Sequence, residues 1–307
     1  MVSVSDPAEI LNLYSFTGKF VKSDFYHVLL FYAKGKPVPT IFATQNENLH
    51  RMLKKPIAGI YLMSNLMSFK PYVDTTISYF FARLDKLFVQ TGDVCDLGAW
   101  LQMFAFDVMG ELTFSKRLGF LERAEDVDGI MGSIWHYFHK TSPVDWLWAK
   151  NPILQRLQSV RMNPIVGFGL ARIAERKSAA KNPSDKESST NSRDFLSRFL
   201  EAQAKDKSIP PWALIARTTS NVTAGSDTTA ILLRTTIHRL LSHPATLSRL
   251  LSELASLPHS APSTPASALS PLTRRVHQRS WASASALRAA ARTGRAARGS
   301  DSVWAKV

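Results

Sequence analysis

The sequence predicts a mainly α-helical fold. Three stretches carry this prediction: residues 70–91, 101–114 and 212–242. The chain has 307 residues, of which 45% are hydrophobic, enough for a sizeable core in one large domain or two small ones. A single cysteine excludes an internal disulfide framework and fits a reducing compartment.

The longest of these stretches runs from about Trp212 to Ser242. Pro210 and Pro211 precede it, and proline is tolerated in the first turn of a helix. Pro244 marks its end, because proline cannot continue a helix. About 30 residues with a rise of about 1.5 Å each make a helix of about 45 Å, long enough to cross a whole domain.

The centre of this stretch is poor in good helix formers and rich in Ser, Thr and Gly. Residues three and four apart share a helix face, and one such stripe is predicted to hold Asn221, Ala224, Gly225 and Thr228. The acid Asp227 lies beside it. Such small side chains would let a flat ligand lie close against the helix backbone. Close packing of a second helix would need the same small residues, and both interpretations stay open here.

The segment Ala224-Gly225-Ser226-Asp227-Thr228-Thr229 matches the pattern Ala/Gly-Gly-x-Asp/Glu-Thr-Thr at every fixed position. It resembles the central helix of the cytochrome P-450 monooxygenases, and the helix expected from Ala245 to about Leu254 fits that family too. The resemblance implies a haem cofactor lying against this helix. It assigns a proton relay to Asp227 and Thr228, because general acid catalysis through a hydroxyl needs a carboxylate behind it. It places Ala224, Gly225 and Thr228 in the haem environment.

A second candidate stretch is basic and reads His50-Arg51-Met52-Leu53-Lys54-Lys55. On a helix His50 and Lys54 share one face, and by themselves they would suit a solvated basic surface. The resemblance implies instead that His50 and Lys54 hold the haem propionates. Lys54 stands where the family usually has Arg, and a lysine binds anions without bidentate geometry.

Residues 106–114 and 116–121 resemble a buried helix and the turn after it in fungal cytochromes P-450 of the pisatin-demethylase-like group. In that family the haem-ligating cysteine lies in a Phe-x-x-Gly-x-x-x-Cys loop near the C-terminus. Cys95 has no such surroundings and is interpreted as structural. The haem-ligating cysteine is therefore absent, and no metal ligand is predicted from this chain.

Residues 128–157 are rich in Trp and Phe. The resemblance implies that they form a lid over the substrate channel, through which membrane association would be possible. His136 and His139 are three apart and could bind a metal, but no third ligand follows at a suitable spacing. Amphipathic or capped helices are further expected over residues 70–91, 164–180 and 194–205.

The net charge of +14 raises the question of nucleic-acid binding. Residues 257–307 hold eight basic residues and one acid, or +7 of that total. They lack interleaved aromatic residues and any nucleic-acid-binding motif, so no nucleic acid is expected as a partner. No apolar run of about 18 residues appears, and the first residues lack the basic region of a signal peptide.

The resemblance covers about residues 2–257, and we expect two regions. Residues 1–256 form a partial cytochrome P-450 fold, the helix B to J region, with the haem-ligand loop and most of the β-sheet missing. Residues 257–307 are an Ala/Ser/Arg-rich tail, disordered or out of frame. Relative to the family the chain is expected to be truncated at both ends.

By resemblance the function is haem-dependent oxidation of a small lipophilic metabolite in fungal secondary metabolism, with electrons from a cytochrome P-450 reductase. Because a haem-thiolate enzyme needs its cysteinate, the chain as given is expected to be inactive and not to bind haem. The alternative is a non-catalytic remnant or helical interaction module without cofactor. The family resides on the endoplasmic-reticulum membrane; this chain lacks the anchor, which leaves the cytoplasm or an unassigned compartment.

Overall fold

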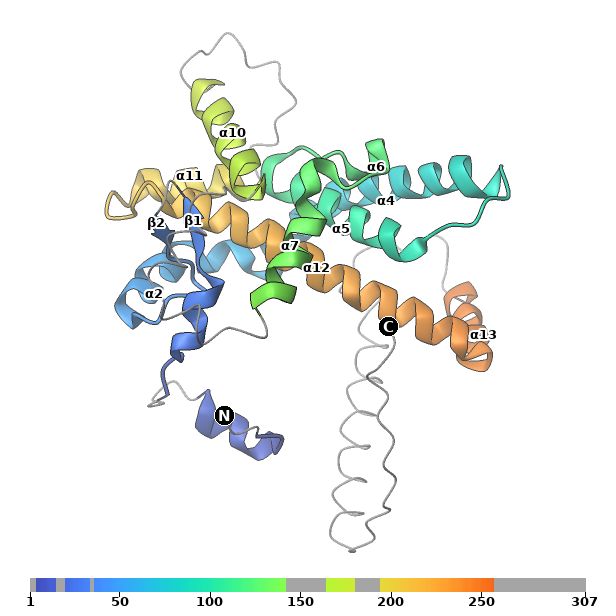
Figure 1. Cartoon of the computed structure of the whole chain (residues 1–307), viewed down its shortest axis with the longest axis horizontal. Helices are drawn as coiled ribbons and strands as arrows, with labels where there is room; N and C mark the ends of the chain where they lie inside the picture. Colours follow the sequence, from blue (N-terminus) through green and yellow to red (C-terminus); the bar gives the residue numbers. More distant parts are fainter. Residues whose placement is uncertain (1–3, 15–19, 34–35, 142–163, 180–193, 257–307) are drawn as a thin grey trace, which may run out of the picture. The chain divides into compact units, whose positions relative to one another are not determined.

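A computed structural model describes residues 4–14, 20–33, 36–141, 164–179 and 194–256 (Figure 1). The chain divides into two compact units, residues 1–238 and 239–307. In its described part the second unit holds the last residues of one long helix and the helix that follows it.

The described residues are mostly helical, which confirms the predicted mainly α-helical fold class. The α-helices are α1 (Ile10–Leu13), α2 (Glu47–Lys54), α3 (Met63–Leu66), α4 (Lys70–Leu84), α5 (Leu97–Phe114), α6 (Phe120–Arg123), α7 (Ile130–Thr141), α10 (Pro164–Ala179), α11 (Phe195–Lys205), α12 (Ala213–Ser242) and α13 (Pro244–Ala255). Short 3-10 helices are η1 (Pro7–Glu9), η2 (Asp24–Leu29), η3 (Lys55–Tyr61), η4 (Met67–Phe69) and η6 (Val127–Gly129), and η5 (Asp85–Val89) is a π-helical turn.

The strands among the described residues are β1 (Phe31–Ala33) and β2 (Lys36–Val38). They pair antiparallel, with Phe31 opposite Val38 and Ala33 opposite Lys36. No helix in the described ranges is long and apolar enough to cross a membrane.

The predicted helix boundaries agree closely with the structure. The stretch expected from about Trp212 to Ser242 is α12, and Pro244 opens α13 as its first residue. The acidic cap expected before α11 is Asp194, whose carboxylate accepts the Ser197 N–H at 2.7 Å. Proline and capping residues locate helix ends because they act on the unpaired backbone groups of the terminal turns.

Helix α5 forms the centre of the core, with apolar side chains buried all round it. The buried Asp107 and Thr113 are polar exceptions, and the carboxylate of Asp107 binds the turn that leads into α6. The oxygens of Asp107 accept backbone N–H groups from Gly119 at 2.8 Å, Phe120 at 3.2 Å and Leu121 at 2.8 Å. Burial raises the pKa of Asp107, while these three hydrogen bonds oppose the shift. This one side chain explains why residues 106–121 form a single recognisable motif.

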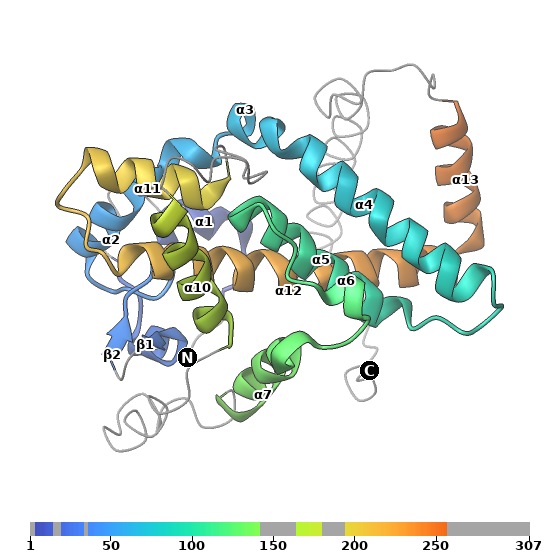
Figure 2. The same cartoon turned by 90° about the horizontal axis from the view of Figure 1, so that it is seen from above.

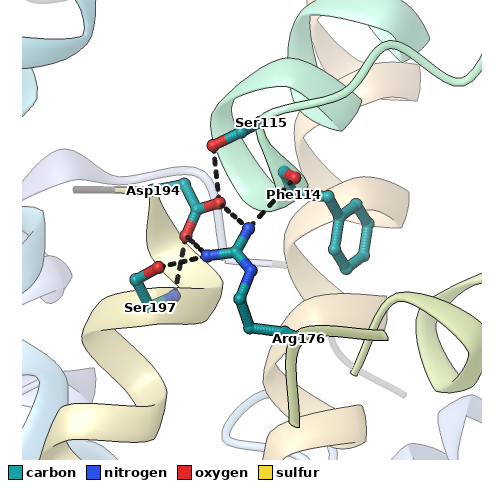
Figure 3. Close-up of polar contacts among 5 residues, drawn as sticks. All are labelled: Phe114, Ser115, Arg176, Asp194 and Ser197. Atoms are coloured by element: carbon teal, nitrogen blue, oxygen red, sulfur yellow. Dashed lines mark hydrogen bonds and ion pairs between the residues drawn. The ribbon is translucent and has the colours of Figure 1, made fainter. Parts of the chain in front are cut away.

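A second buried carboxylate joins three helices (Figure 3). Asp194, fully buried, pairs with Arg176 of α10 at 2.7 Å and accepts the Ser115 hydroxyl from the end of α5 at 2.7 Å. Arg176 also donates to the Ser197 hydroxyl and, at 3.4 Å, to the Phe114 carbonyl. The cluster therefore fixes α10 and the start of α11 against the end of α5.

We predict that Asp107→Ala lowers the free energy of unfolding by about 3 kcal/mol, because three buried N–H groups lose their acceptor. Urea denaturation measures the loss. Asp107→Asn keeps one acceptor oxygen and should lose less, and Asp93→Asn, at an exposed position, is the control. Equal effects of the alanine and control variants would contradict the prediction.

We predict that Asp194→Ala costs about 3–5 kcal/mol, because it leaves the guanidinium of Arg176 without its buried partner. Glu253→Ala, which breaks an exposed ion pair with Arg249 in α13, should cost under about 1 kcal/mol. Both are measured by urea denaturation. A small loss for Asp194→Ala would mean that the cluster is solvated rather than buried.

Candidate active site

Helix α12 carries the candidate site, and several of its hydroxyl groups bond back to the helix itself. Thr218 donates to the Leu214 carbonyl at 3.0 Å, Ser226 to the Val222 carbonyl at 2.6 Å and Thr228 to the Ala224 carbonyl at 2.7 Å. These i to i−4 bonds allow a Ser/Thr-rich sequence to remain helical inside a core.

One side of α12 is buried, and α5 crosses the helix and contacts it (Figures 1 and 2). Val222, Ser226 and Ala230, each four residues apart, are at most 1% exposed. The opposite stripe contains Ala224 and Thr228, both exposed, and continues to Ile231, which is 53% exposed. The helix therefore separates a packed side from an open side.

Gly225 belongs to the packed side, not to the open stripe. A Cβ atom added at Gly225 would lie 2.5 Å from the Met109 sulfur of α5. Of the two interpretations left open for the small residues of α12, close helix packing therefore holds at Gly225. Ala224 and Thr228 retain the open surface that a flat ligand would need.

Asp227 lies on the flank between these sides. The amide nitrogen of Gln102 on α5 is 3.3 Å from the Asp227 carboxylate, and the Gln102 oxygen accepts a hydrogen bond from Arg234 at 3.4 Å. Asp227 is thus held by α5, whereas Thr228, the next residue, is exposed. The structure places the acid and the alcohol as neighbours with different surroundings.

His50 and Lys54 lie on α2, as the helical spacing predicted. The His50 ring nitrogen is 3.2 Å from the Glu47 carboxylate, and this contact lowers the pKa of Glu47. Lys54 is exposed. The end of α2 reaches α12 through the Leu53 carbonyl, which accepts a hydrogen bond from Arg217 at 3.0 Å.

Two residues at this junction were not singled out in the sequence, Tyr61 and Arg217. The Tyr61 hydroxyl donates to the Asn221 side-chain oxygen at 2.6 Å, and burial raises the pKa of Tyr61 to about 12. Arg217, Asn221, Ala224 and Thr228 are spaced by four, three and four residues, so they lie along one stripe of α12. This helical spacing could have indicated Arg217 from the sequence. It could not show that Tyr61, which is 160 residues away, contacts Asn221.

Cys95 lies in the turn before α5, half-buried against the core, and burial raises the pKa of its thiol. His139 stacks on Trp135 with ring centres 4.7 Å apart, and His136 meets the same ring edge-on. Across the described ranges no three His, Cys, Asp or Glu side chains gather where they could hold a metal. Residues 142–157 of the expected lid lie outside the described residues.

The residues present fit one side of the implied haem only. The exposed Ala224 and Thr228 leave α12 free of bulky side chains where a flat ring would lie. A thiolate ligand needs a deprotonated cysteine, and the one cysteine in the sequence has a raised thiol pKa and packs against the core. Helix α12 thus offers a surface where a haem face would lie, and Cys95, packed against the core, does not fit the role of its thiolate ligand.

One long helix crosses the helical domain and carries an acid–alcohol pair, Asp227 and Thr228, near its centre. The family model for Cytochrome P-450 matches residues 1–274, and the chain belongs to the cytochrome P-450 family. This confirms the resemblance seen in the sequence.

Several curated relatives of the chain are fungal monooxygenases. A cytochrome P-450 monooxygenase of Aspergillus terreus is 52% identical over 260 residues, 83% of this chain and 53% of the relative. The cytochrome P-450 monooxygenase cicH of Emericella nidulans is 49% identical over 259 residues, 82% of this chain and 51% of the relative. The chain thus spans about half the length of these relatives.

We predict that Gly225→Ala destabilises the chain by about 1–3 kcal/mol, because the new methyl group overlaps Met109. In the background of Met109→Ala the same change should be neutral or stabilising by up to about 1 kcal/mol, since alanine favours helix more than glycine. A double-mutant cycle by urea denaturation gives the coupling. Additive effects would show that Met109 is not what requires glycine.

Proposed function

We propose that this chain provides the oxygen-facing half of a cytochrome P-450 monooxygenase site for a small lipophilic metabolite of fungal secondary metabolism. The supporting observation is the open stripe of α12, where the exposed Thr228 hydroxyl donates to the Ala224 carbonyl at 2.7 Å beside Asp227. Haem, when bound, supplies oxygen activation. Electrons would come from a cytochrome P-450 reductase, and residues 1–256 would form the domain that carries the site, with residues 257–307 as a tail outside it.

The proposed role of this acid–alcohol pair is to hold and move a proton. Because the Thr228 hydrogen is donated to the Ala224 carbonyl, the Thr228 oxygen retains lone pairs that accept from a water molecule or a ligand. Asp227, held by Gln102, can exchange a proton with water next to that hydroxyl. His50 and Lys54 would bind the haem propionates from α2. Lys54 would do so as a single positive charge, without the bidentate hydrogen bonding of an arginine.

We further propose that this chain alone is inactive as a monooxygenase. The thiolate that holds the iron and directs electron density towards oxygen has no source other than Cys95 in the sequence. The alternative function is a non-catalytic remnant or helical interaction module, and the half-buried thiol of Cys95, packed against the core, is the observation that favours it.

We predict that titration of the purified chain with haem, followed by reduction and carbon monoxide, gives no spectrum of thiolate ligation. Cys95→Ala should leave the spectrum unchanged. A thiolate-type spectrum that disappears in Cys95→Ala would overturn the proposed inactivity. Two variants test the proposed haem surface: Thr228→Phe, which fills the open stripe, and Lys54→Gln. If both weaken haem uptake, the proposed haem surface is supported. If neither changes haem uptake, the cofactor-free alternative is supported.

A further inference from the structure

Arg217 is a buried cation without a carboxylate partner. The residue is 4% exposed, and none of the ion pairs within the described residues involves it. Within the described part of the chain, Nη2 donates to the Leu53 carbonyl at 3.0 Å, while Nε and Nη1 are buried and find no partner there. Removing a guanidinium from water costs several kcal/mol unless an anion and further acceptors compensate.

A second unmet donor lies one helical turn away on the same stripe. The Asn221 side-chain nitrogen is buried and finds no partner among the described residues, while its amide oxygen accepts the Tyr61 hydroxyl at 2.6 Å. Arg217 and Asn221 are four residues apart and therefore neighbours on α12. The unsatisfied atoms at this junction, Nε and Nη1 of Arg217 and Nδ2 of Asn221, are donors, and a group rich in acceptors would satisfy them together.

The surroundings of these donors are apolar. The Phe199 ring lies 5.8 Å from the guanidinium carbon, and both Phe199 and Leu53 are at most 2% exposed. Tyr61 is 41% exposed and forms the side of the junction nearest to solvent. A charged, planar donor fork in an apolar setting suits the carboxylate of a lipophilic molecule, since Arg and carboxylate pair through two parallel hydrogen bonds.

We propose that Arg217, assisted by Asn221, is a binding site for the carboxylate of a lipophilic ligand lying along the open stripe of α12. Arg217 and Thr228 are eleven residues apart, about 16 Å along the helix at about 1.5 Å per residue. Such a ligand would have its carboxylate at Arg217 and its apolar body over Ala224. In naming the substrate as a carboxylic acid the inference rests on the proposed function; the binding site itself does not.

Two carboxylates have this chemistry, that of a small-molecule substrate and a propionate of haem. The probes that separate them are dodecanoate against dodecan-1-ol, and haem against haem dimethyl ester, whose propionates are uncharged. Binding of each is measured by calorimetry and by thermal unfolding of the full chain. No activity is needed, so a failed haem titration would not affect the outcome with dodecanoate.

We predict that dodecanoate binds and stabilises the chain while dodecan-1-ol does not, and that Arg217→Met weakens dodecanoate at least about thirtyfold, the effect of removing one partner of a buried charged pair. Arg217→Lys keeps the charge but loses the fork and should be intermediate. Arg239→Gln, at an exposed arginine of the same helix, is the matched control and should bind normally.

Each outcome decides the proposal. If Arg217→Met weakens haem but not its dimethyl ester, and dodecanoate fails to bind, the carboxylate is a haem propionate. If neither carboxylate depends on Arg217, the proposal is wrong and water satisfies the guanidinium. Arg217→Met also protects the test against misfolding, because replacing an unpaired buried charge by an apolar side chain of similar size is often neutral or stabilising; its unfolding transition without ligand reports this directly.

Discussion

The packing of α12 on α5 is the constraint on which the candidate site depends. Val222, Ser226 and Ala230 are buried on the packed side of α12, and Met109 of α5 lies so close to Gly225 that a methyl group there would overlap it. Once this side is fixed, the period of the helix forces Ala224 and Thr228 to the opposite side. The site is therefore a consequence of close helix packing, and Gly225 contributes to it by its contact with α5 rather than by contact with a ligand.

Two buried carboxylates keep α5 in place for this role. Asp107 binds the backbone at the start of α6, and Asp194 binds α10 and the end of α5. Both bind groups that would otherwise be unsatisfied in the core, which is costly in a low dielectric. These polar contacts position the central helix, whereas the apolar residues around it supply most of the favourable burial.

The helices could be predicted because proline, caps and spacing act locally: Pro244 opens α13, and Asp194 caps α11. The pattern around Thr228 likewise identified the family. Contacts between distant segments could not be predicted, because spacing gives a face but not the element that covers it. For this reason the sequence placed Gly225 on the ligand stripe and passed over Arg217, whose partner Leu53 is 164 residues away.

The polar groups of α12 fall into three kinds, and their distribution supports a functional interpretation of its open stripe. Thr218, Ser226 and Thr228 satisfy themselves by bonding back to the helix. Asp227 is satisfied across the interface by Gln102. Three other polar groups are buried and have no partner among the described residues: the hydroxyls of Ser220 and Thr223 and the amide nitrogen of Asn221. A helix that served packing alone would carry apolar side chains at those positions, because each unmet polar group costs free energy. They lie five to eight residues before Thr228, and this position supports the proposed ligand surface on α12.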